Sequence, residues 1–300
     1  MSSIPSSRRF TLGPQQAGIL LFFCGLVTFA FFDASSKYLL QTYPAPFLNI
    51  MRYSTVAVVG IIMLVRYGHT MPREPAHRWQ LLLRGVALGT VGTCFMTALQ
   101  WMPLAEATAI YFTSPLIVVA LSPWLLSERL TRAKWVAVVT GFAGMLLIVR
   151  PGNELPWLGT LLMVVSAVSF ALFQLLTRRL SSRVPNHIQY AYTAFICFII
   201  TALPAPFFLP DPWPGALDLL FIVSLGLCNA TGQLLLIAAF QRVAASTLAP
   251  FNYCQLLMAV AFSMFWFQQT PDLPALAGIA LIIAAGVFLA TRPSGPPNQA

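Results

Sequence analysis

The chain has 300 residues, of which 58% are apolar and only 8% are charged, and its mean hydropathy is +0.78. Soluble domains carry charge on roughly a quarter of their residues, and a globule of this size has too much surface to keep so many apolar residues out of water. The composition excludes a water-soluble protein and predicts an all-α integral membrane protein.

Ten apolar segments are long enough to be membrane-spanning helices, since about 20 residues cross the hydrocarbon core of a bilayer. Residues 1–16 are too polar for a cleaved signal peptide and should form a cytoplasmic tail. Residues 293–300 should be disordered, and the short connections leave no room for a soluble domain. In chain order we predict spans over 17–39, 46–66, 80–101, 104–126, 133–149, 157–178, 187–208, 216–238, 246–268 and 275–291.

The basic residues predict the orientation of these spans. With the N-terminus inside, only Lys37 and Arg150 lie outside, and Arg52 lies within a span. The acidic residues Glu106, Glu154, Asp211, Asp218 and Asp272 all fall on the outer side. This bias predicts an N-in/C-in topology, and it explains the net charge of +9 by anionic cytoplasmic lipid rather than nucleic acid. Fourteen of the 17 basic residues are assigned to cytoplasmic flanks: Arg8, Arg9, Arg66, Arg73, Arg78, Arg84, Arg129, Arg132, Lys134, Arg178, Arg179, Arg183, Arg242 and Arg292.

The second half of the chain is a weak copy of the first, displaced by about 141 residues. Gln100 falls on Gln241, and Phe112 falls on Tyr253. Each copy holds five predicted spans, over 17–149 and 157–291. Because five is an odd number, the second copy must enter the membrane in the opposite orientation. An inverted five-plus-five repeat is typical of transporters, whose two halves open in turn to opposite sides.

Polar side chains gather in particular spans, where a buried amide is costly unless it is paired or faces water. They either join helices to one another or line a substrate cavity, and their repeat-related positions favour the cavity. We expect an outer gate at Gln100 and Tyr111 and an inner gate at Asn252 and Tyr253. The candidate cavity residues are Asp33, Thr97, Gln100, Trp101, Tyr111, Ser114, Phe173, Gln174, Asn229, Gln233, Asn252, Tyr253 and Gln255.

Two prolines lie in or beside these polar segments. Pro115 falls in the fourth span and Pro250 in the ninth. Each removes a backbone hydrogen bond, so each is either a hinge or a static kink.

Asp33 and Arg52 lie deep in the first and second spans. Counting from the turn near residue 43, both reach nearly the same depth, so we predict that they form an ion pair. Lys37, one turn from Asp33, is a competing partner. Asp33 is alternatively a substrate-binding carboxylate. All three histidines lie in or beside cytoplasmic loops, so the chain offers no proton relay, and facilitated diffusion is the favoured mode.

Three segments resemble a known family: DASSKYL at 33–39, NIMRYS at 49–54 and SERLTRAKWVAVVTGFAGMLLIVRP at 127–151. With the ten spans and the inverted repeat, they resemble the ten-span EamA branch of the drug/metabolite transporter superfamily over residues 15–293. The resemblance implies a basket-shaped fold with a central cavity lined by spans 1, 3, 4, 6, 8 and 9. Within this branch the chain is similar to bacterial exporters of aromatic and other amino acids, and to carriers of S-adenosylmethionine.

We therefore expect a monomeric transporter of the bacterial inner membrane that exports aromatic and other neutral amino acids and related metabolites. The alternatives are an uptake carrier for S-adenosylmethionine or another small metabolite, a proton-coupled drug or metabolite antiporter, and a channel. An enzyme is excluded, because no metal cluster, nucleophile–base pair or paired carboxylates lie at membrane depth. We expect no cofactor, no metal and no nucleic-acid partner.

Overall fold

The computed structural model describes residues 14–68, 74–126, 132–149, 155–180, 183–240, 242–243 and 248–291. Within these ranges every regular element is helical, which confirms the predicted all-α class. The elements are α1 (Pro14–Leu39), α2 (Ala45–Tyr67), α3 (Pro75–Leu99), α4 (Leu104–Tyr111), α5 (Ser114–Leu126), α6 (Arg132–Val149), α7 (Trp157–Leu180), α8 (Asn186–Ala202), η1 (Ala205–Phe208), α9 (Ala216–Phe240), η2 (Ala249–Asn252), α11 (Tyr253–Phe265) and α12 (Leu273–Thr291).

Seven segments among the described residues are helical, long and apolar enough to cross a membrane, and one of them is Leu104–Leu121, which runs through α4 into α5. The predicted third span begins too late, because α3 starts at Pro75, and proline favours the first turn of a helix. The predicted seventh span is too long. α8 ends at Ala202 and a 3-10 turn follows, since Pro204 and Pro206 cannot donate the hydrogen bonds that would continue the helix.

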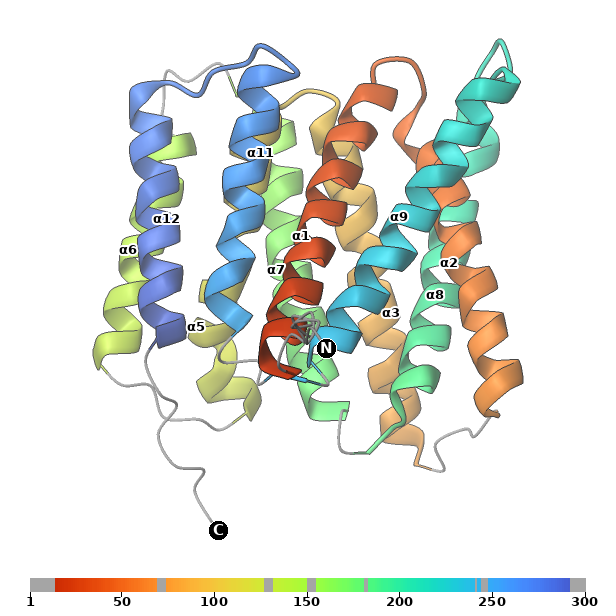
Figure 1. Cartoon of the computed structure of the whole chain (residues 1–300), viewed down its shortest axis with the longest axis horizontal. Coiled ribbons are helices and arrows are strands. Elements are labelled where there is room, and N and C mark those ends of the chain that lie inside the picture. The colour runs from red at the N-terminus through yellow and green to blue at the C-terminus, as the bar shows by residue number, and fades with distance from the viewer. Residues whose placement is uncertain are drawn as a thin grey trace, which may run out of the picture.

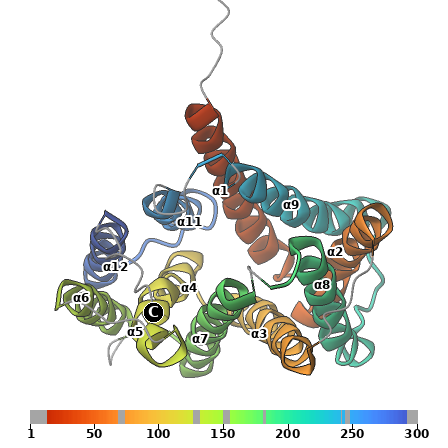
Figure 2. The same cartoon turned by 90° about the horizontal axis from the view of Figure 1, so that it is seen from below.

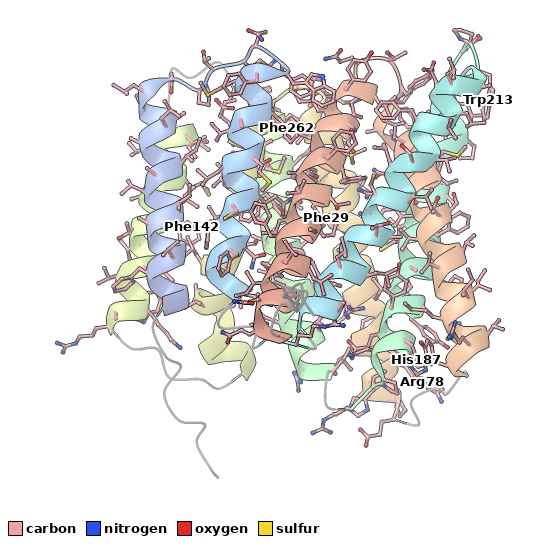
Figure 3. The ribbon with its side chains drawn as sticks, in the orientation of Figure 1. Phe29, Arg78, Phe142, His187, Trp213 and Phe262 are labelled. Atoms are coloured by element: carbon pink, nitrogen blue, oxygen red, sulfur yellow. The ribbon has the colours of Figure 1, made fainter. Side chains whose placement is uncertain are left out.

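The helices stand side by side as one bundle, and α1 begins at the end of the bundle where α12 finishes (Figure 1). Arg78 and His187 lie at that same end, whereas Trp213 lies at the opposite end (Figure 3). The positive charge assigns the first end to the cytoplasm. We call it the inner end and the other the outer end.

Most helices of the two halves begin or end at equivalent positions of the repeat. Since the chain crosses the bundle in alternate directions, α7 runs antiparallel to α1, as an inverted repeat requires. Equivalent boundaries lie 141 positions apart: Leu39 and Leu180 end α1 and α7, Ala45 and Asn186 begin α2 and α8, Pro75 and Ala216 begin α3 and α9, and Arg132 and Leu273 begin α6 and α12.

Each half packs mainly against the other half. α1 packs against α9 and, symmetrically, α7 against α3, while α2 packs against its counterpart α8 and α6 against α12. Viewed from below, the helices form a ring in which these pairs are neighbours (Figure 2). The contacts repeat at residue level: a Cβ on Gly85 would meet the side chain of Ile196, and one on Gly226 would meet that of Thr55. Close packing between the halves therefore holds the bundle together.

The α6–α12 contact generates a stability prediction. A Cβ on Gly144 would lie 2.7 Å from the carbonyl oxygen of Gly278, so Gly144→Leu must push the two helices apart. Overpacking of this kind costs about 1–3 kcal/mol, and the melting temperature of the purified protein should fall by several degrees. Gly215→Leu is the matched control, because nothing lies within 4 Å of a Cβ at Gly215. Equal melting temperatures for the two variants would contradict this packing.

The assignment of the two ends can be tested by cysteine labelling. In a chain whose five native cysteines are replaced by alanine, a membrane-impermeant maleimide should label Trp213→Cys in intact cells. It should label Arg78→Cys only after the membrane is permeabilised. The opposite pattern would invert the topology.

Candidate functional site

A central cavity of about 640 Å³ lies between the two halves. Among the described residues that line it, the charged ones are Asp33, Arg52 and Arg84. Four tyrosines and a set of amides and hydroxyls complete the polar lining: Tyr53, Tyr111, Tyr190, Tyr253, Ser114, Gln174, Thr193, Asn229, Gln233, Asn252 and Gln255. The cavity therefore combines three full charges with neutral hydrogen-bonding groups.

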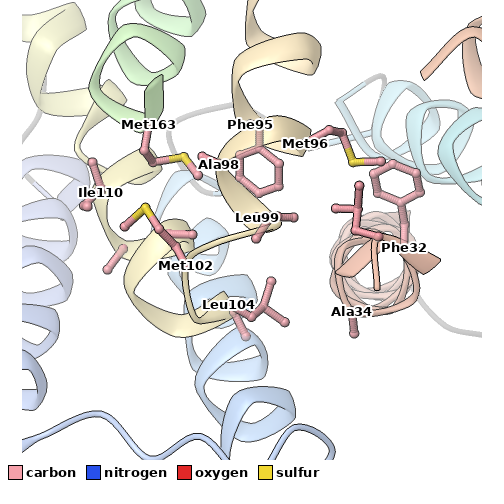
Figure 4. Packing of buried hydrophobic residues seen from close by; sticks show 14 of the residues in the cluster. Phe32, Ala34, Phe95, Met96, Ala98, Leu99, Met102, Leu104, Ile110 and Met163 are labelled. Carbon is pink, nitrogen blue, oxygen red and sulfur yellow. The ribbon is translucent and has the colours of Figure 1, made fainter. Parts of the chain in front are cut away.

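The cavity extends toward the inner end. Arg84, Tyr190 and Gln233 line it, and they lie in the inner halves of α3, α8 and α9. In the outer half, by contrast, side chains from α1, α3 and α4 pack as a buried core (Figure 4). Met96, Leu99, Met102 and Leu104 of this core are at most 1% exposed. The outer side is the closed one in this structure.

Lys37 helps to close the outer end. Its Nζ donates to the backbone oxygens of Leu99, at 3.2 Å, and Met102, at 2.6 Å, so it caps the C-terminal end of α3, where cations are stabilised. It also lies 5.6 Å from the centre of the Phe267 ring. Glu106, which the charge pattern places outside the membrane, is instead buried in α4. Lys37 is therefore bound at the outer closure and does not pair with Asp33.

Asp33 bonds to an amide from the second half of the chain. Gln255 on α11 donates from Nε2 to Asp33 Oδ2 at 3.0 Å. The predicted ion pair between Asp33 and Arg52 is not formed in this structure, although both residues line the cavity. The guanidinium of Arg52 lies instead over two rings, 4.3 Å from the centre of Tyr53 and 5.4 Å from that of Phe32. The equal depth of the two residues is not enough to bring the charged groups together, because ring contacts hold Arg52.

Arg52 has unused hydrogen-bonding capacity. The residue is only 5% exposed, and its Nε and Nη2 have no hydrogen-bond partner. A Cβ on Gly92 would collide with Nη2, so this glycine leaves the room that the guanidinium occupies. An unpartnered buried cation is costly. Nε and Nη2 are themselves shielded from the cavity, so a ligand carboxylate could accept hydrogen bonds from them only after the guanidinium turns.

Arg84 is the residue that the sequence reasoning missed. It was assigned to the cytoplasmic flank, but it is buried in α3 and lines the cavity. Its Nε donates to Thr177 Oγ1 at 2.7 Å, and its Nη1 donates to Gln189 O at 2.9 Å and to Thr193 Oγ1. Pro75 was the available signal, because proline favours the first turn of a helix. A predicted third span that began at Pro75 would have placed Arg84 in the third turn of the helix and not in the cytoplasmic flank. Two arginines, Arg52 and Arg84, therefore line the cavity.

Aromatic rings form one wall of the cavity. Tyr111 lies 4.9 Å from Phe170 and 5.3 Å from Phe95, measured between ring centres. Phe170 and Phe173 are stacked 5.9 Å apart at an interplanar angle of 16°. Such a wall offers flat faces to a planar or cationic group.

The structure brings most of the predicted cavity residues together. Gln100 and Trp101 are exposed instead, because α3 ends at Leu99 and a turn follows. Thr97 donates to the backbone oxygen of Thr93 within α3. Gln100 and Tyr111 therefore do not meet as an outer gate, whereas Asn252 and Tyr253 lie together in the lining. Ten predicted residues line the cavity: Asp33, Tyr111, Ser114, Phe173, Gln174, Asn229, Gln233, Asn252, Tyr253 and Gln255.

The two predicted hinges lie where helices are interrupted. α4 ends at Tyr111 and α5 begins at Ser114, directly before Pro115, and Thr113 Oγ1 donates to Ile110 O at 2.6 Å in the break. In the second half, Pro250 lies in η2, which leads into α11. Phe112 and its repeat counterpart Tyr253 contact each other across the cavity, 6.0 Å between ring centres.

The chain was compared with known proteins. The S-adenosylmethionine uptake transporter of Rickettsia bellii is 28% identical over 272 residues, covering 91% of this chain and 92% of that protein. The pseudopaline exporter of Pseudomonas aeruginosa is 26% identical over 284 residues, covering 93% and 98%. The riboflavin transporter of Brucella anthropi is 26% identical over 266 residues, covering 86% and 92%.

A solved crystal structure superposes with a TM-score of 0.64 at 21% identity, covering 91% of this chain and 96% of the other, and this likeness shows the fold alone. The family model of the EamA-like transporters matches residues 16–150 and 157–292, which correspond to the two repeats. The chain belongs to the EamA-like transporter family and is a multi-pass membrane transporter of small metabolites, not an enzyme.

Proposed function

We propose that this transporter carries metabolites with an amino-acid group across the bacterial inner membrane, exporting aromatic and other neutral amino acids and related compounds by facilitated diffusion. The observation that supports this most directly is that Asp33 and Arg52 line one cavity without forming an ion pair. Opposite charges that do not neutralise each other match the ammonium and carboxylate groups at the α-carbon of an amino acid.

The bonding capacity of the two charges fits this role. Asp33 accepts one hydrogen bond, from Gln255, and an ionised carboxylate can accept several. The ammonium group of the substrate would bind there. Arg52 has unpaired donors at Nε and Nη2, which are buried in this structure and which a turn of the guanidinium would present to the cavity. There the guanidinium fork would bind a carboxylate through two parallel hydrogen bonds.

The side chain of the substrate would lie against the aromatic wall. Tyr111, Phe170 and Phe173 present ring faces on which an aromatic or aliphatic side chain packs without specific hydrogen bonds, so broad specificity is expected. The cavity of about 640 Å³ lies within the usual range for small-molecule sites.

Movement between two mirrored arrangements would complete the cycle. This structure has its outer half packed and its cavity toward the inner end. Because the repeats are inverted, exchanging their conformations would open the outer half and pack the inner one. Pro115 and Pro250 are our candidates for the points of bending. No histidine is among the described cavity residues, and Asp33, the acid among them, is assigned to the ammonium group of the substrate, so we propose movement down the substrate gradient.

S-adenosylmethionine uptake is the second candidate, because the Rickettsia relative of that name matches 91% of this chain. S-adenosylmethionine has the same amino-acid group, and its sulfonium and adenine ring would face the aromatic wall. Liposome uptake of amino acids, S-adenosylmethionine, riboflavin and cationic drugs, measured side by side, distinguishes these substrates. Preferred uptake of cationic drugs would favour the antiporter alternative.

Removing either charge should impair transport of the amino-acid group. Asp33→Asn and Arg52→Gln should each lower uptake at limiting substrate about 10- to 100-fold, the loss expected for a hydrogen bond to a charged group. Gln100→Ala, at an exposed position, should transport like the wild type. The double variant Asp33→Arg with Arg52→Asp should stay inactive, because the two residues bind the substrate rather than each other. Recovery in this variant would show a structural ion pair.

The mode of transport can be tested by counterflow in proteoliposomes. Substrate on the far side should accelerate uptake, the rate should saturate, and a pH gradient alone should leave it unchanged. Acceleration by the pH gradient alone would support a proton-coupled antiporter instead. A rate that neither saturates nor responds to substrate on the far side would indicate a channel.

A further inference from the structure

We propose that Arg84 forms a second anion-binding subsite at the inner part of the cavity, which extends the substrates from neutral amino acids to α-amino acids with a distal second carboxylate and binds these more tightly than their neutral amides. The inference rests on the proposed function, because it assigns the α-amino and α-carboxylate groups to Asp33 and Arg52. It adds to that function the charge and shape of the rest of the substrate.

Arg84 is held in one orientation by its neighbours. Three hydrogen bonds tie Nε and Nη1 to Thr177, Gln189 and Thr193 on α7 and α8. The guanidinium also lies 4.4 Å from the centre of the Phe173 ring. Nη2 donates no hydrogen bond to the residues that the structure describes, and it belongs to a side chain that lines the cavity. A guanidinium fixed in this way loses little freedom when it binds an anion.

The charge of Arg84 is not compensated by the protein. It forms no ion pair within the described part of the chain, and the only acid lining the cavity there is Asp33, which bonds to Gln255 on another wall. A neutral side chain could form the hydrogen bonds that connect α3 to α7 and α8. A charged side chain away from water costs several kcal/mol unless it is paired, so the charge of Arg84 is not explained by these connections. With Asp33 ionised, the lining of the cavity carries one negative and two positive charges. A ligand with one ammonium and two carboxylates, with a net charge of −1, would balance them.

The positions from which the two arginines reach the cavity favour an extended substrate. Gly92 on α3 contacts Arg52, and Arg84 lies eight residues earlier on the same helix, which corresponds to about 12 Å along the axis. Phe173 of the aromatic wall lies under the Arg84 guanidinium. The substrate would therefore extend from Arg52 along the wall to Arg84. A linear amino dicarboxylate fits this path better than a compact one.

Binding to the purified full-length protein tests the inference. The probes are L-α-amino dicarboxylates whose distal carboxylate lies two to five methylene groups from the α-carbon, each compared with its terminal amide. In the wild type the acid should bind about tenfold more tightly than its amide for the longer members. Arg84→Gln should bring the affinities for acid and amide close together, mainly by weakening the acid, and Arg84→Lys should retain part of the preference.

Controls separate the possible failures. Thr193→Val removes a hydrogen bond to Arg84 but keeps the charge of Arg84, so the preference for the acid over the amide should persist in this variant. If Thr193→Val lost the preference to the same extent as Arg84→Gln, Arg84 would serve only to hold the helices together. Equal affinities for acid and amide in the wild type would overturn the subsite and leave the proposed function intact. If neither acids nor amides bind, the proposed function fails, and the subsite fails with it. An unchanged melting temperature of Arg84→Gln, or of Arg84→Lys if the glutamine variant does not fold, shows that the protein is intact.

Discussion

The cost of a charge in a medium that cannot solvate it governs how this protein uses its few charged residues. Lys37 meets that cost with two backbone oxygens at the end of α3, and Asp33 meets part of it with the amide of Gln255. Arg52 is different, because rings surround it and two of its nitrogens have no acceptor. Lys37 closes the outer end, and Arg52 is available to a ligand. The division between scaffold and site thus follows how each charge is compensated.

The two repeats are symmetric in how their helices pack, but not in where their charged residues lie. Gly85 and Gly226 face repeat-related neighbours, and the helix boundaries keep their 141-residue offset. The charged residues break this pattern, since the positions equivalent to Asp33, Arg52 and Arg84 are Gln174, Thr193 and Leu225. Two similar halves give the bundle two arrangements of comparable packing, while charge in one half lets the cavity distinguish one end of a substrate from the other.

Sequence predicted the spans and the repeat because both are local or periodic signals. Run length and loop charge define a span without knowledge of its neighbours, and Pro115 pointed to the break after α4. The partners of Asp33 and Arg84 were not predictable in this way, since Gln255 is 222 residues from Asp33 and Thr193 is 109 from Arg84. The depth of a residue in the membrane can be counted along its helix from the rise per residue. The direction in which its side chain points depends on how the helix is rotated about its axis, and packing determines that rotation. That is why Asp33 and Arg52 share a depth and still do not pair.

The same unpaired charges bear on how a carrier avoids moving while it is empty. When the cavity is open to the inner side, water in it reaches only the small exposed parts of Arg52 and Arg84, but it still lowers the cost of their charge. Closing the inner half around an empty cavity would remove that water, and the penalty for each ion would rise to several kcal/mol. With the proposed substrate, a bound amino acid would replace the water with fixed opposite charge, so the loaded protein would pass through the closed state more easily than the empty one. Coupling movement to occupancy in this way needs no proton site, because the difference in charge compensation between the loaded and the empty cavity supplies the free energy.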